Sequence, residues 1–251
     1  MSMLPDGMDA VDWASIPTPR SRVPRAGRGA PEWCDLPSPR EGLAALAAAR
    51  SLPQVAAASS SLTSSAVLWG HMGAVFPAAV VAAPFLLDIA ERQDCAPARG
   101  AALALLGDMM DSLPFAGFDR FTAPDGHRAP LCCAVAGLVR ERRASISALG
   151  ESGVSLVRNS DEHWRFDVRD AAVQGNGALV LGVLGGRIPT PPPEGEIHHA
   201  GGVARAASIA LACPVDDGTG EACLRLGGMS ASELCTVGAV IHPARCGDEV
   251  H

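Results

Sequence analysis

The 251-residue chain contains no lysine and no tyrosine, and aromatic residues make up only 4% of it. Its formal net charge of -7 repels a polyanion, so nucleic-acid contacts would depend on clustered arginines alone. The chain also lacks a long uninterrupted apolar run. The most hydrophobic stretch, between His71 and Asp88, is shorter than the roughly 20 residues a bilayer requires and contains Pro77 and Pro84. We therefore expect no membrane span, and nucleic acid is a minority hypothesis.

The eight cysteines are scattered, with no Cys-x-x-Cys pair and no dense Cys/His tract. This spacing argues against a zinc ribbon. Because the first 28 residues lack the apolar segment of a secretory signal, we expect a cytoplasmic protein with reduced, buried thiols, although a disulfide between distant cysteines stays open. Adjacent His198 and His199 would diverge on a helix and lack a third ligand. We therefore expect no metal site and no cofactor.

Proline and helical periodicity divide the chain into four predicted parts. Residues 1–37 form an extended Pro/Arg-rich arm, whose large anchors Trp13 and Trp33 would dock on the chain's own body or on a partner. A helical domain follows at 38–185, a Pro-rich linker at 186–199, and a C-terminal helical extension at 200–251. The expected helices span 38–50, 53–70, 75–91, 97–111, 130–149, 151–158, 203–213 and 230–241, with another beginning at Asp161. No convincing set of strands emerges, so the predicted fold class is all-α.

Two segments carry a resemblance to a known family. They are Ala82-Ala83-Pro84-Phe85-Leu86-Leu87 and the opening Val11-Asp12-Trp13-Ala14-Ser15. In these segments the chain resembles actinobacterial HEAT-repeat-like proteins over about residues 8–170. The resemblance implies an α-solenoid of stacked antiparallel helix pairs, at about 38–70, 72–112 and 130–158. It brings no shared active-site motif, so no functional residue is carried over.

Three groups of polar residues are candidates for chemistry. His71 lies in a turn between helices, where an imidazole could act as a base or ligand, although it more often fixes backbone carbonyls there. Asp108 and Asp111 would share one helix face, which could raise one pKa, although solvation at a helix end is the simpler interpretation. The densest candidate cluster consists of Asp161, Glu162, His163 and Arg165. In a plain helix, however, Asp161 and Arg165 would form only a weak exposed pair.

These features leave several functions open. The first hypothesis is a HEAT-like interaction protein that binds a protein partner through its concave face, in a hetero-oligomer. The second is an enzyme or enzyme subunit acting on a small molecule in bacterial specialised metabolism, in which Arg165 would hold an anionic group and His163 or an acid would move a proton. The third is a HEAT-like DNA-alkylation-repair glycosylase with a local cationic groove at Arg140, Arg142 and Arg143. No phosphate loop or nucleophile elbow supports a conventional hydrolase, kinase or dehydrogenase.

Overall fold

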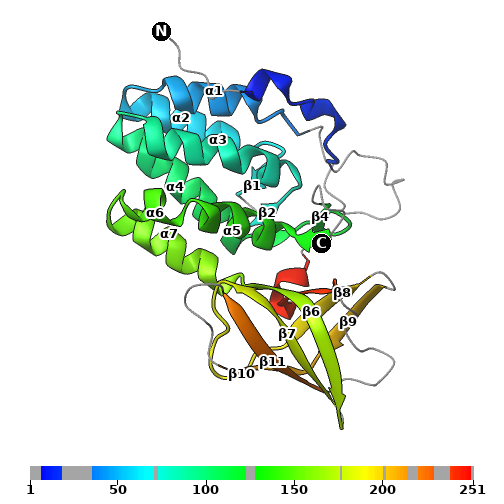
Figure 1. The fold of residues 1–251 in the computed structure, drawn as a ribbon. Coiled ribbons are helices and arrows are strands. Elements are labelled where there is room, and N and C mark those ends of the chain that lie inside the picture. Colours follow the sequence, from blue (N-terminus) through cyan, green and yellow to red (C-terminus); the bar gives the residue numbers. More distant parts are fainter. Residues whose placement is uncertain are drawn as a thin grey trace, which may run out of the picture.

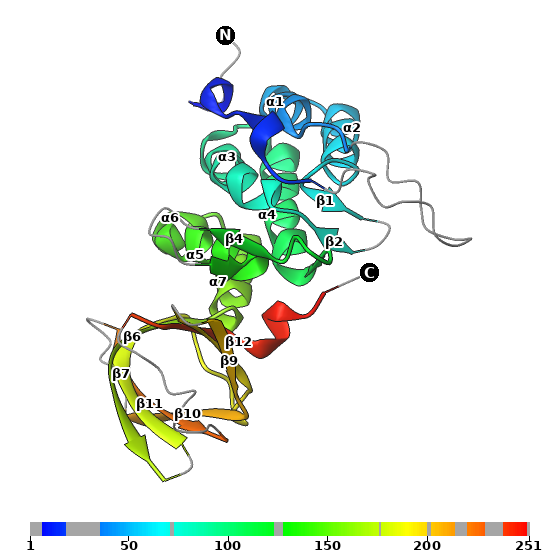
Figure 2. The same cartoon turned by 90° about the vertical axis from the view of Figure 1, so that its right-hand side faces the viewer.

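A computed structural model describes residues 7–18, 36–70, 73–122, 128–175, 177–199, 202–213, 220–228 and 238–249. In these ranges the chain builds a helical part first and a β-sheet part second (Figure 1). The last short helical turn, η4 (Ala244–Gly247), returns from the sheet to the helices (Figure 2). This return brings the C-terminal segment against the middle of the chain.

Seven α-helices make up the described helical part. Proline begins several of them as expected, because a missing N–H costs nothing in a first turn: Pro53 and Pro97 lie in the first turns of α2 and α4. The helices are α1 (Arg40–Ala48), α2 (Leu52–Leu62), α3 (Ala78–Arg92), α4 (Ala96–Asp111), α5 (Leu131–Glu141), α6 (Arg143–Ser147) and α7 (Glu151–Glu162). The predicted helix at 151–158 therefore continues to Glu162, and the predicted one at 130–149 is divided at Arg142.

The core of the helical part surrounds α3. Ten of its fifteen residues are buried, and Pro84 lies inside the helix without ending it. The ring of Trp13 packs against Phe85 at a centroid distance of 6.0 Å, so the described piece of the arm docks on the chain's own body. Trp33 lies outside the described residues. Docking within the chain was the simpler of the two expectations for Trp13.

Short strands fill the connections between these helices. β1 (Leu68–Trp69) pairs with β2 (Ala74–Val75), which pairs in parallel with β3 (Leu113–Pro114). β4 (Arg120–Thr122) and β5 (Arg128–Pro130) form a separate antiparallel pair directly before α5. Because β5 ends at Pro130 and α5 begins at Leu131, this pair positions the first turn of α5 and the two cysteines in that turn.

The second half of the chain forms a seven-stranded antiparallel sheet in the order β10-β11-β7-β6-β12-β8-β9. Phe166 and Val168 are buried on alternate positions of the first strand, as expected when one face of a strand covers a core. The strands are β6 (Arg165–Gln174), β7 (Gly177–Gly185), β8 (Gly195–His199), β9 (Gly202–Ala206), β10 (Ser208–Cys213), β11 (Glu221–Gly227) and β12 (Val240–Pro243).

The sheet is strongly curved and encloses its own core (Figures 1 and 2). Trp164, Phe166, Ile197, Ile209 and Leu224 are buried together in it. Ile209 and Leu224 come from β10 and β11 at one end of the strand order, and Ile197 comes from β8 near the other end. A side chain on Gly195 would collide with Ile209, because its Cβ would lie 1.9 Å from Cδ1 of that residue. The glycine therefore permits β8 and β10 to approach across the core.

The predicted all-α solenoid is wrong. Residues 165–185, predicted as the end of the helical domain, form the β6–β7 hairpin, and 203–213, predicted as a helix, form most of β9 and β10. The predicted 186–199 linker ends in β8, which lies inside the sheet. The predicted helix at 230–241 falls mostly outside the described residues, and its last two residues begin β12. Of the helices in the described ranges, none combines the length and apolar character that crossing a bilayer would require.

Candidate metal centre

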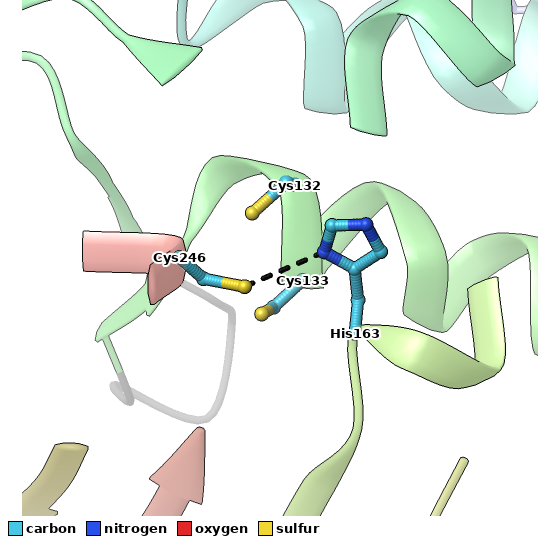
Figure 3. A group of neighbouring side chains, drawn as sticks. All are labelled: Cys132, Cys133, His163 and Cys246. Atoms are coloured by element: carbon cyan, nitrogen blue, oxygen red, sulfur yellow. Dashed lines mark hydrogen bonds between the residues drawn. The ribbon is translucent and has the colours of Figure 1, made fainter. Parts of the chain in front are cut away.

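Three cysteines and one histidine meet where the helical part joins the sheet. They are Cys132, Cys133, His163 and Cys246, and their potential ligand atoms all lie within 4.8 Å of one another. All four residues are buried. Figure 3 shows the three Sγ atoms and the imidazole pointing toward a common centre, with Sγ of Cys246 3.4 Å from Nδ1 of His163. The cysteines also form a small core cluster separate from the two larger cores.

Each ligand position is set by the end of a secondary-structure element. Cys132 and Cys133 occupy the first turn of α5, where unpaired N–H groups and the helix dipole favour negative charge. His163 is the C-cap of α7, at the point where the backbone leaves the helix and enters β6. Cys246 lies in η4 directly after β12. The cluster therefore connects three segments that are distant in sequence.

Two arginines surround the cluster and favour negative charge on the sulfur atoms. Arg140 of α5 donates hydrogen bonds to the backbone carbonyls of Ser160 and His163, the latter at 3.0 Å. Arg245 precedes Cys246 and contacts Glu162, with Nη2 3.2 Å from the carboxylate. Burial acts to lower the pKa of Arg245, but Glu162 and Cys246 raise it above its ordinary value. A buried thiol close to a guanidinium group loses its proton more readily than an isolated buried thiol does.

The three thiols do not ionise alike in the metal-free cluster. Hydrogen bonds from Cys132 and Cys133 lower the pKa of Cys246 far below its ordinary value. Burial, followed by hydrogen bonds to its two cysteine neighbours, raises the pKa of Cys133. For Cys132 the hydrogen bond with Cys133 favours the thiolate, but the bond to Cys246 and burial together raise its pKa. The contacts within the cluster thus favour the thiolate at Cys246 over one at Cys132 or Cys133.

This donor set fits a zinc ion. Zinc binds cysteine sulfur at about 2.3 Å and histidine nitrogen at about 2.0–2.1 Å in a tetrahedron, which separates the ligand atoms of a three-sulfur, one-nitrogen site by roughly 3.5–3.8 Å. The observed separations, all within 4.8 Å, need only small side-chain movements to reach this geometry. Four protein ligands fill the tetrahedron, which is typical of structural zinc sites rather than catalytic ones. Soft thiolates also select against magnesium and calcium.

A small pocket opens beside the cluster. Its volume is about 250 Å³, and its lining includes Cys132, His163 and Cys246 together with Arg245 and Asp248. This volume is below the roughly 300–1,000 Å³ of most small-molecule sites. The comparison with structural zinc sites accordingly rests on the four protein ligands and not on this pocket.

The residues of the predicted polar cluster separate in the structure. Asp161 pairs with Arg143, and Arg165 binds Asp167 with an Nη2–Oδ1 distance of 2.7 Å. Glu162 pairs with Arg245, and both side chains are more than half exposed, so this pair adds little stability. Only His163 enters the buried cluster. Asp161 and Arg165 are therefore engaged elsewhere, whereas Glu162 and His163 line the same small pocket.

The other predicted candidates lie elsewhere. Asp108 lines a groove of about 540 Å³ between α4 and α7, together with Asp111, Glu151 and Asn159. Burial, and then the charge of Asp111, raise the pKa of Asp108. The groove contains none of the four cluster residues, although Asp111 and Asn159 also line the pocket beside the cluster. His71 lies outside the described residues.

The three arginines considered for a DNA groove are all engaged within the chain. Arg140 is held by backbone carbonyls, and Arg142 lies 2.5 Å from Asp88 and 3.0 Å from Glu91. Arg143 pairs with Asp161. These acidic partners offset the positive charge that a DNA-binding groove would need.

A buried imidazole lies close to the candidate centre. His242 of β12 is 1% exposed, and neither ring nitrogen has a hydrogen-bond partner among the described residues. Its ring meets that of His198 edge-on at a centroid distance of 5.5 Å. Burial, and then the positive charges of His198, Arg165 and Arg120, lower the pKa of His242 to about 3. His242 is therefore neutral in the folded protein at ordinary pH.

This lowered pKa predicts a loss of stability in acid. Below about pH 6.5 the unfolded chain takes up a proton on His242, whereas the folded chain does so only near pH 3. Stability should therefore fall as the pH drops through this window, by up to about 1.4 kcal/mol per pH unit. Urea unfolding of the metal-free protein between pH 7 and pH 4 measures the slope. His242→Gln should flatten it, and the matched change His199→Gln should not; equal slopes in all three proteins would refute the assignment.

Comparisons with known proteins add no family to this picture: no family model matches the chain, and neither curated proteins nor solved structures gave a match. The resemblance to HEAT-repeat-like proteins accordingly stays a hypothesis, and the solenoid that it implied is contradicted by the sheet. The candidate function therefore rests on the geometry of the site.

Sequence reasoning missed the candidate metal centre because it searched for local ligand spacing. His163 and Cys246 are 83 residues apart, and the two remaining ligands are adjacent on one helix turn. One available signal was the position of Cys132 and Cys133 two and three residues after Pro130, at a predicted helix start where thiolates are favoured. A second was His163, which lies in the predicted polar cluster at the start of the helix expected from Asp161.

Proposed function

We propose that this protein binds one zinc ion through Cys132, Cys133, His163 and Cys246, and that the metal fastens the helical part to the β-sheet part. The observation that carries the proposal is the convergence of four buried zinc-type ligand atoms within 4.8 Å. They come from α5, the end of α7, and η4, so one ion would join segments on both sides of the junction. Metal binding would thereby contribute directly to folding.

The charge balance supports zinc in this position. Three thiolates, a neutral imidazole and Zn²⁺ carry one net negative charge, and Arg140 and Arg245 lie on either side of the ligands. A thiol–imidazole hydrogen bond accounts for the approach of His163 Nδ1 to Cys246, but it leaves the convergence of Cys132 and Cys133 on the same point unexplained. Metal ligation explains the thiols and the imidazole together.

A cobalt titration tests this proposal. Tetrahedral Co²⁺ bound by thiolates should give strong absorption bands that saturate at one equivalent per chain and disappear when zinc is added, because both ions would occupy the same four ligands. His163→Ala should weaken binding and change the spectrum, whereas His199→Ala should do neither. Absence of thiolate–cobalt bands in the reduced protein would refute the proposal.

Three further expectations concern the cellular location, the protein partner and the enzyme hypothesis. A thiolate-bound metal requires reduced cysteines, and the six described cysteines are free, so a cytoplasmic location is part of the proposal. A protein partner also stays a prediction, but it can no longer depend on the concave face of a helical array. The proposed enzyme also stays a prediction: Asp161 and Arg165 pair with other residues, whereas Asp111, Glu162 and His163 line the same small pocket.

A further inference from the structure

A buried ion pair bridges the two parts of the chain near the candidate metal centre. Nη2 of Arg120, on β4, lies 2.8 and 2.9 Å from the two carboxylate oxygens of Glu196, on β8. The two side chains are only 10% and 6% exposed, which makes this the most buried arginine–carboxylate pair among the described residues. Asp119 also contacts Arg120, with its oxygen 2.8 Å from Nε.

Glu196 is kept in its ionised form beside Arg120. Burial alone would raise the pKa of Glu196, but His198 and Arg120 lower it below its ordinary value, so the carboxylate stays ionised. Removing water from such a pair costs free energy that the attraction often only offsets. Net stability alone is therefore a weak explanation for the pair, and a role in fixing geometry is a stronger one.

The pair lies directly beneath the turn that carries Cys246. Gly247 follows that cysteine, and a Cβ at this glycine would lie 2.8 Å from Oε2 of Glu196 and 3.1 Å from Nη2 of Arg120. The other end of the turn is fixed by the sheet, because the N–H of Ala244 donates to the carbonyl of Glu194 at 3.1 Å. The backbone on both sides of Cys246 is thus supported by β8 and its neighbours.

We propose that Arg120 and Glu196 are positioning residues for the metal centre, which hold the η4 turn so that Cys246 faces Cys132, Cys133 and His163. This inference rests on the proposed zinc function. Arg140 holds the backbone carbonyl of the ligand His163 through a hydrogen bond. The Arg120–Glu196 pair would support the ligand Cys246 in a comparable way. Outer partners of this kind orient metal ligands and tune their affinity.

The test compares zinc affinity in variants of the full chain, measured by competition with a chromophoric chelator. Glu196→Gln should weaken zinc binding about 10–100-fold and alter the cobalt spectrum, because the turn loses its charged support. Gly247→Ala should act in the same direction without changing any charge, since its methyl group would push against the pair. Arg120→Lys should restore part of the affinity lost in Arg120→Met.

The matched control is Glu221→Gln, which removes the acidic member of the exposed Arg169–Glu221 pair in the same sheet. It should leave both zinc affinity and the cobalt spectrum unchanged. Wild-type zinc affinity and spectrum in both Glu196→Gln and Gly247→Ala would overturn the positioning role while leaving the zinc function intact. Failure of the wild-type protein to bind zinc would instead refute the proposed function itself. If Glu196→Gln does not fold, Gly247→Ala decides the question.

Discussion

Replacing Cys133 by serine is expected to abolish stoichiometric zinc binding and to remove the stability that the metal provides. The side chain is buried among the other ligands, and a serine hydroxyl cannot replace a zinc-bound thiolate. A ligand that binds only the folded state at 1,000 times its Kd stabilises that state by about 4 kcal/mol. For a chain of this size the loss corresponds to a fall of roughly 10 °C in Tm. Calorimetry with and without one equivalent of zinc measures it.

The control for this substitution is Cys95→Ser, because Cys95 is a free cysteine outside the cluster. This variant should keep the full zinc-dependent increase in Tm. In excess chelator, Cys133→Ser and the wild type should melt within a few degrees of each other, since neither then holds metal. A Cys133→Ser protein that zinc stabilises as strongly as the wild type would show that Cys133 is not a ligand.

Truncating Trp164 to alanine is expected to destabilise the metal-free protein by about 3–5 kcal/mol. Trp164 is fully buried in the core of the sheet, and Gly186 packs so closely against it that a Cβ there would lie 3.0 Å from Cα of the tryptophan. The neighbouring backbone therefore has little room to collapse into the cavity. Urea unfolding followed by circular dichroism measures the loss, because fluorescence would change with the substitution itself.

Two further variants set the scale of this effect. Trp164→Phe should lose clearly less stability, because the ring that remains fills part of the cavity. Val173→Ala, on the same sheet but 59% exposed, should change stability by less than about 0.5 kcal/mol. If Trp164→Ala costs less than about 1 kcal/mol, the residue does not fill the sheet core as described.

The helices were predictable because their signals are local. Pro53 and Pro97 lie in the first turns of α2 and α4, where helix starts were expected. The spacing of apolar residues also predicts α3 and α4, whose buried side chains form a large part of the helical core. Such signals depend on residues three or four positions apart. They do not depend on what the rest of the chain does.

The sheet was not predicted because some strands contain helix-favouring residues, and because the alternation of buried and exposed residues along the other strands was overlooked. Arg165-Phe166-Asp167-Val168 alternates buried with partly exposed residues, and Gly175 has a positive φ of 60° at the turn into β7. This pattern favours a hairpin more than an interrupted helix. The Ala-rich segment of β10 is harder, because alanine favours helices and only long-range pairing with β11 makes this segment a strand.

The candidate site could be predicted only in part. His163 was predicted as part of a polar cluster at the start of a helix. Its partners in the candidate site lie on α5 and η4, and that placement depends on how the sheet returns to the helices. The roles of Glu196 and Arg120 depend on the same return. Spacing rules for zinc ligands assume a short local loop, so they do not detect ligands that fold topology brings together.

X-ray absorption at the zinc edge of the purified, reduced protein tests the central claim most directly. One zinc per chain should show about three sulfur neighbours at roughly 2.3 Å and one nitrogen at roughly 2.0–2.1 Å. A first shell made of nitrogen and oxygen, or one with fewer than two sulfur atoms, would contradict a centre built from Cys132, Cys133, His163 and Cys246.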